Sequence, residues 1–461
     1  MRLSHFVYSL LLISFCYLLT VANSGCGQIG MPTGGPKDSI PPRLLSASPQ
    51  LNSVNVTTNK ITLTFDEYVD LKDAQTNVLV SPFPKKTPVV DFRLKTVTVK
   101  LKDSLLPNTT YSINFGSAIV DNNEGNPFKD FTYVFSTGNQ IDSFILSGKV
   151  VLAENGKTDS TLIAMLYRST EDSAVQKNKP DYISKLNRDG SFTFVNLPAG
   201  NFKVYALKDG DGGKTYNSKK ELFAFADSPV TVSENTEPVI LLASAFEKEK
   251  LQTVKSAGPA KKLIYTLAPG SQIQDLLKPF VISFNNPLKK FDPAKLILRD
   301  TNYTPIPSVS WVIDSNQTKI SAAVKWQEGM EYRLIMDTTA VTDSADNYIS
   351  KLDTIRFTSK KLTDYGKVVL RFTNLDLTKH PVLQFVLGEE IKNSYPLSAM
   401  EWSNNFVEPG EYDIRILFDK NKNGIWEPGD YSKKLQPEMA ITLLQKIAVR
   451  ANWDNERDIK F

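Results

Sequence analysis

The chain is poor in the side chains on which most enzymes depend. Among 461 residues there are two histidines, His5 and His380, and two cysteines, Cys16 and Cys26. The sequence has no G-x-S-x-G motif, no H-E-x-x-H motif, no phosphate-binding glycine loop and no cysteine pair at metal-ligand spacing. Because the common hydrolase, zinc-protease and nucleotide-binding signatures are missing, we expect a protein that is not an enzyme and that requires no cofactor.

Net charge and long apolar runs are also scarce. Lys and Arg exceed Asp and Glu by 54 − 50 = 4, and so small an excess predicts no nucleic-acid partner. One apolar run, from Phe6 to Thr20, follows Arg2 near the N-terminus. It is shorter than a typical membrane span and has the pattern of a secretory signal. We therefore expect no membrane-spanning segment in the exported protein.

Small residues lead from this run into Cys26, which indicates a lipoprotein signal. Ser24 and Gly25 allow a peptidase to approach, and the Cys26 thiol can carry the lipid, although Asn23 stands where such signals usually have an aliphatic residue. We predict a lipoprotein signal peptide at 1–25, then acylated Cys26 and a Pro/Gly-rich tether at 26–42. The alternative is an ordinary signal peptide whose cleavage leaves an unmodified cysteine. In either case one cysteine remains, so no intrachain disulfide can form.

From residue 43 onward the sequence predicts short β-strands. Apolar residues alternate with polar ones from Ile61 to Phe65 and from Thr96 to Leu101, and the pattern recurs up to Ser136 with turn residues between the segments. This spacing predicts a β-sandwich at 43–138 and a second one at 139–245. Within the second, we expect the segments 190–197 and 202–207 to form a β-hairpin around a Pro-Ala-Gly turn.

The second half of the chain repeats the first. Ile282–Phe284 resembles Leu63–Phe65, and later matches keep the same order with an offset of 219 to 222 residues. We expect a linker at 246–262 and two further sandwiches at 263–360 and 361–461. The predicted fold class is therefore all-β, a tandem array of Ig-like and prealbumin-like β-sandwich domains after a signal peptide.

One loop has the spacing of a calcium-binding loop. Short oxygen-bearing side chains stand at alternate positions and a glycine, Gly424, allows a sharp turn. The candidate ligands are Asp419, Asn421, Asn423, the Ile425 carbonyl and Asp430. The alternative is a turn in which Asp and Asn side chains bond their own backbone.

Trp402 and Trp426 are candidate binding residues. We expect both to lie in loops, where an exposed indole is a common binding anchor. The alternative is that each covers one end of a sandwich core.

Residues 26–138 resemble a known family. Cys26 is followed by Pro32–Asp38, then Pro41–Pro42, then a strand ending in Phe65-Asp66-Glu67. This order is similar to Bacteroidota lipoproteins that carry a bacterial Ig-like domain of the S-layer-associated type, while 190–209 resembles carboxypeptidase-regulatory, prealbumin-like sandwiches. The resemblance implies a non-catalytic outer-membrane lipoprotein that acts as a surface or accessory subunit of an outer-membrane complex, such as the β-barrel assembly machinery.

The predicted function is thus a non-catalytic, membrane-anchored scaffold. The expected partners are the membrane, through the N-terminal lipid, and outer-membrane proteins. The sequence does not decide which leaflet of the outer membrane the protein faces, because the acidic run that follows the cysteine in surface-exported relatives is absent here. The alternative function is a calcium-dependent adhesin-like lipoprotein that binds carbohydrate or the cell surface through Trp402, Trp426 and the loop at Asp419.

Overall fold

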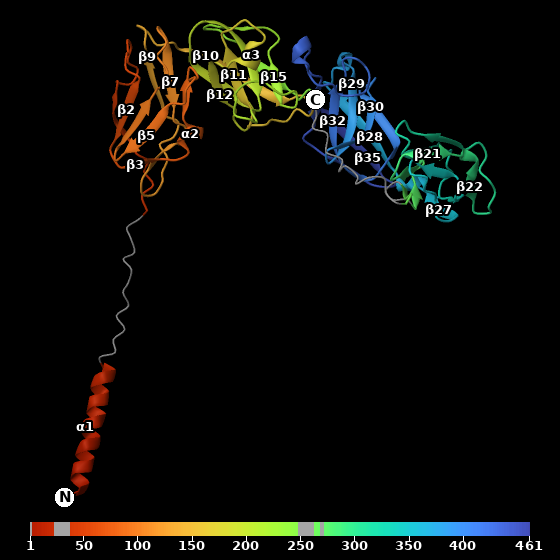
Figure 1. Ribbon diagram of the computed structural model, residues 1–461, viewed down its shortest axis with the longest axis horizontal. Helices are drawn as coiled ribbons and strands as arrows, with labels where there is room; N and C mark the ends of the chain where they lie inside the picture. Colours follow the sequence, from red (N-terminus) through yellow and green to blue (C-terminus); the bar gives the residue numbers. More distant parts are fainter. Residues whose placement is uncertain (1, 23–36, 248–261, 268–271) are drawn as a thin grey trace. The chain divides into compact units, whose positions relative to one another are not determined.

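The computed structural model describes residues 2–22, 37–247, 262–267 and 272–461. Cys26 and most of the predicted tether and linker lie outside these residues. The described chain begins with a helix, α1 (Arg2–Ala22), at the predicted signal peptide (Figure 1). None of the described helices combines the length and the apolar character that a membrane span requires. The remainder is built mainly from strands, so the predicted all-β fold class is confirmed.

The chain divides into two compact units. Unit 1 comprises residues 1–80 and 86–141, and unit 2 comprises 81–85 and 142–461. The described residues form four large hydrophobic clusters, each from a separate stretch of sequence. We number the sandwiches built over these clusters 1 to 4 along the chain. The exact predicted domain boundaries stay a prediction.

Sandwich 1 contains three sheets, with strand orders β1-β2-β6-β5, β4-β7-β9 and β3-β8. Its elements are β1 (Leu44–Ser48), β2 (Lys60–Phe65), β3 (Val69–Leu71), α2 (Ala74–Asn77), β4 (Leu79–Ser81), β5 (Val89–Arg93), β6 (Thr96–Lys100), β7 (Thr110–Asn114), β8 (Ile119–Asp121) and β9 (Thr132–Ser136). Alternate residues of β2, Ile61, Leu63 and Phe65, are fully buried. The alternation in the sequence therefore corresponds to one face of the strand in the core.

Sandwich 2 pairs a three-stranded sheet, β13-β10-β17, with a sheet of order β12-β11-β14-β15, to which β16 adds through β14. Its elements are β10 (Phe144–Leu152), β11 (Ile163–Tyr167), α3 (Ala174–Lys177), β12 (Tyr182–Lys185), β13 (Ser191–Leu197), β14 (Gly200–Leu207), β15 (Phe223–Phe225), β16 (Val230–Val232) and β17 (Val239–Ala243). Strands β10 and β17 run parallel.

Sandwich 3 has sheets of order β18-β20-β24-β23 and β19-β27-β25-β22 and a two-stranded sheet, β21-β26. Its elements are β18 (Tyr265–Leu267), β19 (Ile273–Gln274), β20 (Phe280–Phe284), β21 (Leu288–Phe291), η1 (Pro293–Lys295), β22 (Leu296–Asp300), β23 (Ser310–Ile313), β24 (Lys319–Ala323), β25 (Glu331–Met336), β26 (Val341–Asp343) and β27 (Asp353–Ser359).

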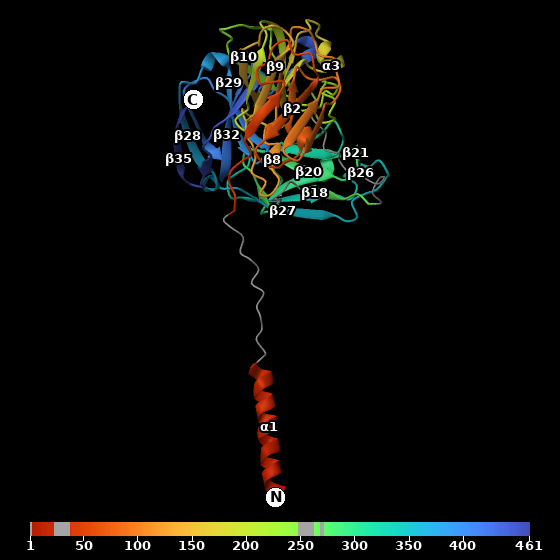
Figure 2. The same ribbon diagram turned by 90° about the vertical axis from the view of Figure 1, so that its left-hand side faces the viewer.

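Sandwich 4 has sheets of order β31-β28-β35 and β30-β29-β32-β33, with β34 added through β32. Figure 2 labels β28, β35, β29 and β32 of this sandwich. Its elements are η2 (Leu362–Asp364), β28 (Gly366–Thr373), η3 (Leu377–Lys379), β29 (Pro381–Leu387), β30 (Glu390–Pro396), β31 (Glu401–Val407), β32 (Gly410–Phe418), η4 (Tyr431–Lys433), β33 (Met439–Thr442), β34 (Ile447–Val449) and β35 (Asp454–Lys460).

The strand orders agree with the predicted internal repeat. Strand for strand, β13-β10-β17 of sandwich 2 corresponds to β31-β28-β35 of sandwich 4, and both sheets end in a parallel pair. In the same way, the sheet β1-β2-β6-β5 of sandwich 1 corresponds to the sheet β18-β20-β24-β23 of sandwich 3, and β2 is equivalent to β20. The chain therefore repeats a pair of architectures.

The predicted hairpin at 190–207 is wrong. Strand β13 pairs with β10, whereas β14 pairs with β11, β15 and β16 in the opposite sheet. The chain crosses between sheets at Pro198 and Ala199, so Phe194 and Val204 reach one core from opposite sides. A hairpin and a crossover give the same alternation of apolar residues, and for this reason the pattern could not distinguish them.

Candidate functional site: the loop between β32 and β33

The predicted calcium residues lie in the loop that joins β32 to β33. Asp419, at its start, is buried. One carboxylate oxygen of Asp419 accepts a hydrogen bond from the Lys422 N–H (2.7 Å), and the other accepts one from the Gly424 N–H (2.6 Å). Gly424 has a φ of 77°, a left-handed conformation that costs glycine little. Asp419 thus organises a tight loop by bonding the loop's own backbone.

Glu438 is the second acidic anchor of the loop. Its carboxylate accepts hydrogen bonds from the Lys420 N–H (2.7 Å) and the Glu427 N–H (3.1 Å), so it fastens both ends of the turn. Burial raises the pKa of Glu438, and the nearby charges of Asp419 and Glu427 raise it further. Sequence reasoning missed Glu438, because a single glutamate shortly before a strand has no distinctive spacing.

The other predicted ligands also bond within the loop. The Asn421 side chain accepts from the Asn423 N–H (3.1 Å), and the Asn423 side chain accepts from the Ile425 N–H (2.7 Å). Asp430 instead caps the short helix η4, where it accepts from the Ser432 N–H (3.0 Å). In the part of the chain that the structure describes, no three His, Cys, Asp or Glu side chains are grouped to hold a metal. The predicted set includes amides and a carbonyl, so the calcium site stays a prediction.

In the equivalent loop of sandwich 2, a lysine side chain supplies the positive charge beside the aspartate. Asp209 and Lys214 occupy the positions of Asp419 and Gly424, since β14 and β32 correspond at an offset of 210 residues. The Lys214 ammonium forms an ion pair with the Asp209 carboxylate. Sandwich 4 has glycine at this position and therefore lacks that internal counter-charge.

The calcium prediction has a direct test. An ion that binds only the folded chain stabilises it by about 2.7 kcal/mol at a hundredfold excess over its Kd. The melting temperature of the full chain should therefore rise when EDTA is replaced by millimolar calcium, and the double variant Asn421→Ala and Asn423→Ala should lose that rise. Equal melting temperatures of the unsubstituted chain in EDTA and in calcium would contradict the prediction.

Both candidate tryptophans are packed against the fold. Trp402 lies in strand β31, not in a loop as predicted, and its ring centroid is 5.4 Å from that of Phe385 in the core of sandwich 4. Trp426 lies in the loop, where its indole N–H donates to the Glu438 carbonyl (2.7 Å) and its ring packs against Leu417. Trp402 was misplaced because three consecutive polar residues, Ser403, Asn404 and Asn405, follow it and give β31 no alternation of apolar and polar residues. The binding roles of the two residues stay predictions.

Tyr431 carries the loop into contact with sandwich 2. Its side chain is 8% exposed and its ring lies 5.2 Å and 5.1 Å from the rings of Phe223 and Phe225, respectively. The hydroxyl donates to the Asp172 carbonyl (2.9 Å) and lies 2.9 Å from the Tyr205 hydroxyl. Tyr431 has one proton to donate, so Tyr205 is the donor of the pair. Burial raises the pKa of both phenols, which therefore stay neutral at pH 7.

Polar contacts surround this tyrosine. Lys434 lies 3.8 Å from the centroid of the Tyr431 ring and forms an ion pair with Asp172 (2.9 Å). The Gln436 amide donates to the Phe225 carbonyl (2.9 Å) and to the Asp227 carboxylate (2.8 Å). The loop therefore joins the two sandwiches within unit 2 through a buried aromatic centre with a hydrogen-bonded rim, the arrangement of a specific interface.

Backbone hydrogen bonds extend the same contact. The N–H groups of Ala440 and Thr442 in β33 donate to the carbonyls of Ala153 (2.7 Å) and Asn155 (3.0 Å), which follow β10. The outer edge of β33 is thus paired with a segment of sandwich 2. Such pairing satisfies an edge that would otherwise be free to recruit another chain.

Sandwich 3 is joined to sandwich 4 by a charged contact. Lys360 forms ion pairs with Asp275 and Glu408, each at 3.2 Å, and the Tyr365 hydroxyl accepts from the Leu276 N–H (2.9 Å). Burial would raise the pKa of Asp275, but hydrogen bonding and the Lys360 charge outweigh it and lower that pKa. Sandwiches 2, 3 and 4 are therefore connected by side chains as well as by the chain.

The fold defines the class: an array of β-sandwiches. Residues 38–137, which contain sandwich 1, match the family model described as a bacterial Ig-like domain. This match confirms the Ig-like part of the resemblance found in residues 26–138, and the lipoprotein part stays a prediction. No match to the sequence was found among curated proteins.

Solved structures also align with the chain. The N-terminal part of the bacterial S-layer protein SbsC is 17% identical, with a TM-score of 0.17, and the alignment covers 44% of each chain. BcpA, the major pilin subunit of Bacillus cereus, is 12% identical with a TM-score of 0.16, over 70% of this chain and 99% of the pilin. At these TM-scores the likeness carries no argument about fold or function.

Proposed function

We propose that the protein is a non-catalytic scaffold or accessory subunit of a cell-envelope complex. The observation that supports this proposal is the joining of sandwiches 2, 3 and 4 within unit 2, through Tyr431 on one side and Lys360 on the other. Such a body suits a protein that holds partners at fixed positions.

The attachment belongs to the same proposal. Acylation of Cys26 would hold the protein at the outer membrane, and the predicted tether at 26–42 would connect the lipid to the first sandwich. Outer-membrane proteins are then the partners within reach. The residues favour neither face of the membrane.

Fractionation and copurification test this function. The wild-type protein should fractionate with the outer membrane and copurify with an outer-membrane protein after mild detergent extraction. Cys26→Ser should move most of the protein into the soluble fraction, because no lipid can then be attached. Cys16→Ser, inside the predicted signal, is the matched control and should fractionate like the wild type.

Two outcomes would contradict the proposal. A wild-type protein that elutes as a lone monomer from gently solubilised membranes would argue against a role as an accessory subunit. A Cys26→Ser variant that still fractionates fully with the outer membrane would show that acylation is not required for the attachment.

A further inference from the structure

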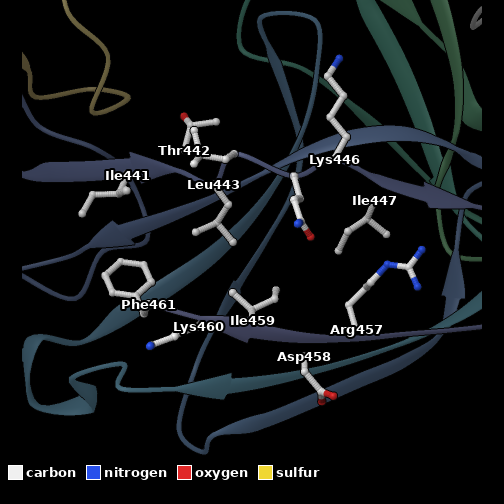
Figure 3. Close-up of a pocket in the computed structure, with 12 residues that line it drawn as sticks. Ile441, Thr442, Leu443, Lys446, Ile447, Arg457, Asp458, Ile459, Lys460 and Phe461 are labelled. Atoms are coloured by element: carbon white, nitrogen blue, oxygen red, sulfur yellow. The ribbon is translucent and has the colours of Figure 1, made fainter. Parts of the chain in front are cut away.

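Sandwich 4 has an apolar groove on one open side. The groove runs between strand β35 and the segment from β33 to β34, and its cavity volume is about 550 Å³. Leu443, between β33 and β34, lies across the groove from Ile459 of β35 and from Phe461 (Figure 3). Leu444, on the rim, is fully exposed. A cavity of this size and character is typical of a binding site.

The rim of the groove is mainly basic. Lys446, Arg457 and Lys460 stand on it together with one acidic residue, Asp458. Asp458 lies 3.8 Å from Arg371 and Lys446 lies 3.9 Å from Asp413, which reduces the effect of both charges on a ligand. In the described ranges, neither Arg457 nor Lys460 forms an ion pair with a carboxylate. The rim thus favours a ligand that carries negative charge beside its apolar groups.

A strand edge borders the groove. Among the described strands, β35 pairs only with β28, so the other side of β35 presents backbone N–H and C=O groups to the groove. An extended peptide can add to such an edge and place alternate side chains in the adjoining hollow. The free edge of β35 therefore favours a peptide over a lipid, because a lipid chain cannot form these backbone hydrogen bonds.

The equivalent groove of sandwich 2 already contacts a polypeptide segment. Phe225 and Ile240 of that groove correspond to Thr442 and Asp458 in sandwich 4, as the strand registers show. Gln436 lines the sandwich 2 groove and donates to the carbonyl of Phe225. The same architecture thus receives a segment from outside its own sandwich.

The sandwich 4 groove is also continuous with the interface already described. Ile441, on its wall, lies between Ala440 and Thr442, whose N–H groups bond the segment that follows β10. The edge of β33 therefore pairs with chain from another sandwich, and the neighbouring edge of β35 is left for a further strand.

We propose that this groove binds an extended segment of a partner protein in which apolar residues alternate with acidic ones. Its backbone pairs with β35, and its apolar side chains fill the groove beside Leu443 and Ile459. Residues 457 and 460 lie on opposite faces of β35, so the carboxylates on the outer face of the segment meet Lys460, and one carboxylate at the end of its apolar row meets Arg457. This inference rests on the proposed scaffold function and names the surface through which a partner is held.

Site-specific crosslinking tests the groove in the full chain. A photoreactive benzophenone amino acid is placed at Leu444, and at Leu387 as the matched control, because Leu387 is an aliphatic residue that is 44% exposed at the end of β29 in the same sandwich. We expect position 444 to crosslink one protein at least tenfold more strongly than position 387. Mass spectrometry should place the crosslink in a segment of alternating apolar and acidic residues.

Affinity measurements complete the test. A synthetic peptide of the crosslinked segment should bind the wild-type chain, and Leu444→Asp and Arg457→Glu should each weaken its binding at least tenfold. Leu387→Asp should leave binding unchanged. Leu444 and Arg457 are both exposed, so Leu444→Asp and Arg457→Glu should retain the wild-type melting temperature.

The opposite results are distinct. In the crosslinking experiment, four results overturn the groove proposal: crosslinks to lipid alone, crosslinks to a second copy of this chain, equal crosslinking from both positions, or no crosslink. In the affinity experiment, equal peptide affinity of the wild type and Leu444→Asp overturns it. If Leu444→Asp still copurifies with the wild-type partner, the groove proposal fails while the scaffold function stands. A wild-type chain that copurifies with nothing contradicts the scaffold function itself.

Discussion

Replacement of Tyr431 by alanine should uncouple sandwich 4 from sandwich 2. The substitution removes a buried ring from among Tyr205, Phe223 and Phe225 and leaves the Asp172 carbonyl without that donor. Truncation of a buried aromatic residue costs about 3–5 kcal/mol. A contact between two sandwiches that each have their own core can be lost at this cost without unfolding either one. We therefore expect a local loss of coupling in a chain that stays folded.

Hydrogen exchange should detect that loss at identified amides. The Ala440 and Thr442 N–H groups bond carbonyls of sandwich 2, so their exchange in Tyr431→Ala should accelerate at least a hundredfold. Amides between β29 and β32, inside sandwich 4, serve as the internal reference and should exchange as in the wild type. Calorimetry should show a separate, lower transition for sandwich 4.

Tyr431→Phe is the matched control. It keeps the ring contacts and removes only the hydroxyl that joins Tyr205 to Asp172, at a cost of about 1–3 kcal/mol for the polar groups left behind. Its effect on exchange should therefore lie between those of the wild type and Tyr431→Ala. Unchanged exchange of Ala440 and Thr442 in Tyr431→Ala would show that the aromatic centre does not hold the two sandwiches together.

The sequence predicts the strands better than the way in which they are joined. Ile61, Leu63 and Phe65 alternate with threonine, and this local pattern is sufficient to predict β2. The local pattern cannot predict that β13 and β14 lie in different sheets. A hairpin and a crossover between sheets bury the same residues of these two strands. Patterns of period two report which face of a strand is buried and carry no information on its neighbour.

The interface itself was beyond prediction from sequence. Tyr431 follows a loop with calcium-loop spacing, and its contact Tyr205 lies 226 residues earlier in the chain. Nothing in the residues around Tyr431 indicates an aromatic pocket in another sandwich. Asp419 shows the opposite case: its short-range spacing correctly indicated a loop organised by oxygen atoms, and left open whether those atoms hold an ion or the backbone.

Asp343→Ala should produce a large loss of stability in unit 2. Asp343, at the end of β26, is fully buried. Its carboxylate accepts from the N–H groups of Ala345 (2.9 Å) and Asn347 (2.8 Å) and from the Asn286 amide (2.6 Å). Alanine removes the acceptor for all of these donors, and each buried donor left unsatisfied costs about 1–3 kcal/mol. We expect a loss of at least about 3 kcal/mol in the free energy of unfolding, measured by denaturant titration of unit 2.

Two variants separate this polar network from a general effect of substitution. Asp343→Asn keeps the shape but directs an amide N–H₂ at either the Asn286 amide or the backbone N–H groups, so it should lose a smaller but clear part of the stability. Asp346→Ala, in the same turn, removes an exposed carboxylate paired with Lys289 at 2.8 Å and should change stability by less than about 0.5 kcal/mol. Equal stability of Asp343→Ala and Asp346→Ala would contradict the role given to Asp343.

The pH dependence gives an independent check on the same carboxylate. Burial would raise the pKa of Asp343, but hydrogen bonds from Asn286 and Asn347 and from backbone N–H groups outweigh it, so the pKa lies below its ordinary value. A lowered pKa in the folded state means that the unfolded chain binds the proton more readily. The stabilisation is therefore complete above the unfolded pKa of about 3.9 and is lost as the pH falls toward the folded pKa. The difference in unfolding free energy between wild type and Asp343→Ala should be constant from pH 5 to pH 8 and should shrink below about pH 4. A difference that instead grows on acidification would mean that the buried carboxyl is bound in its protonated form.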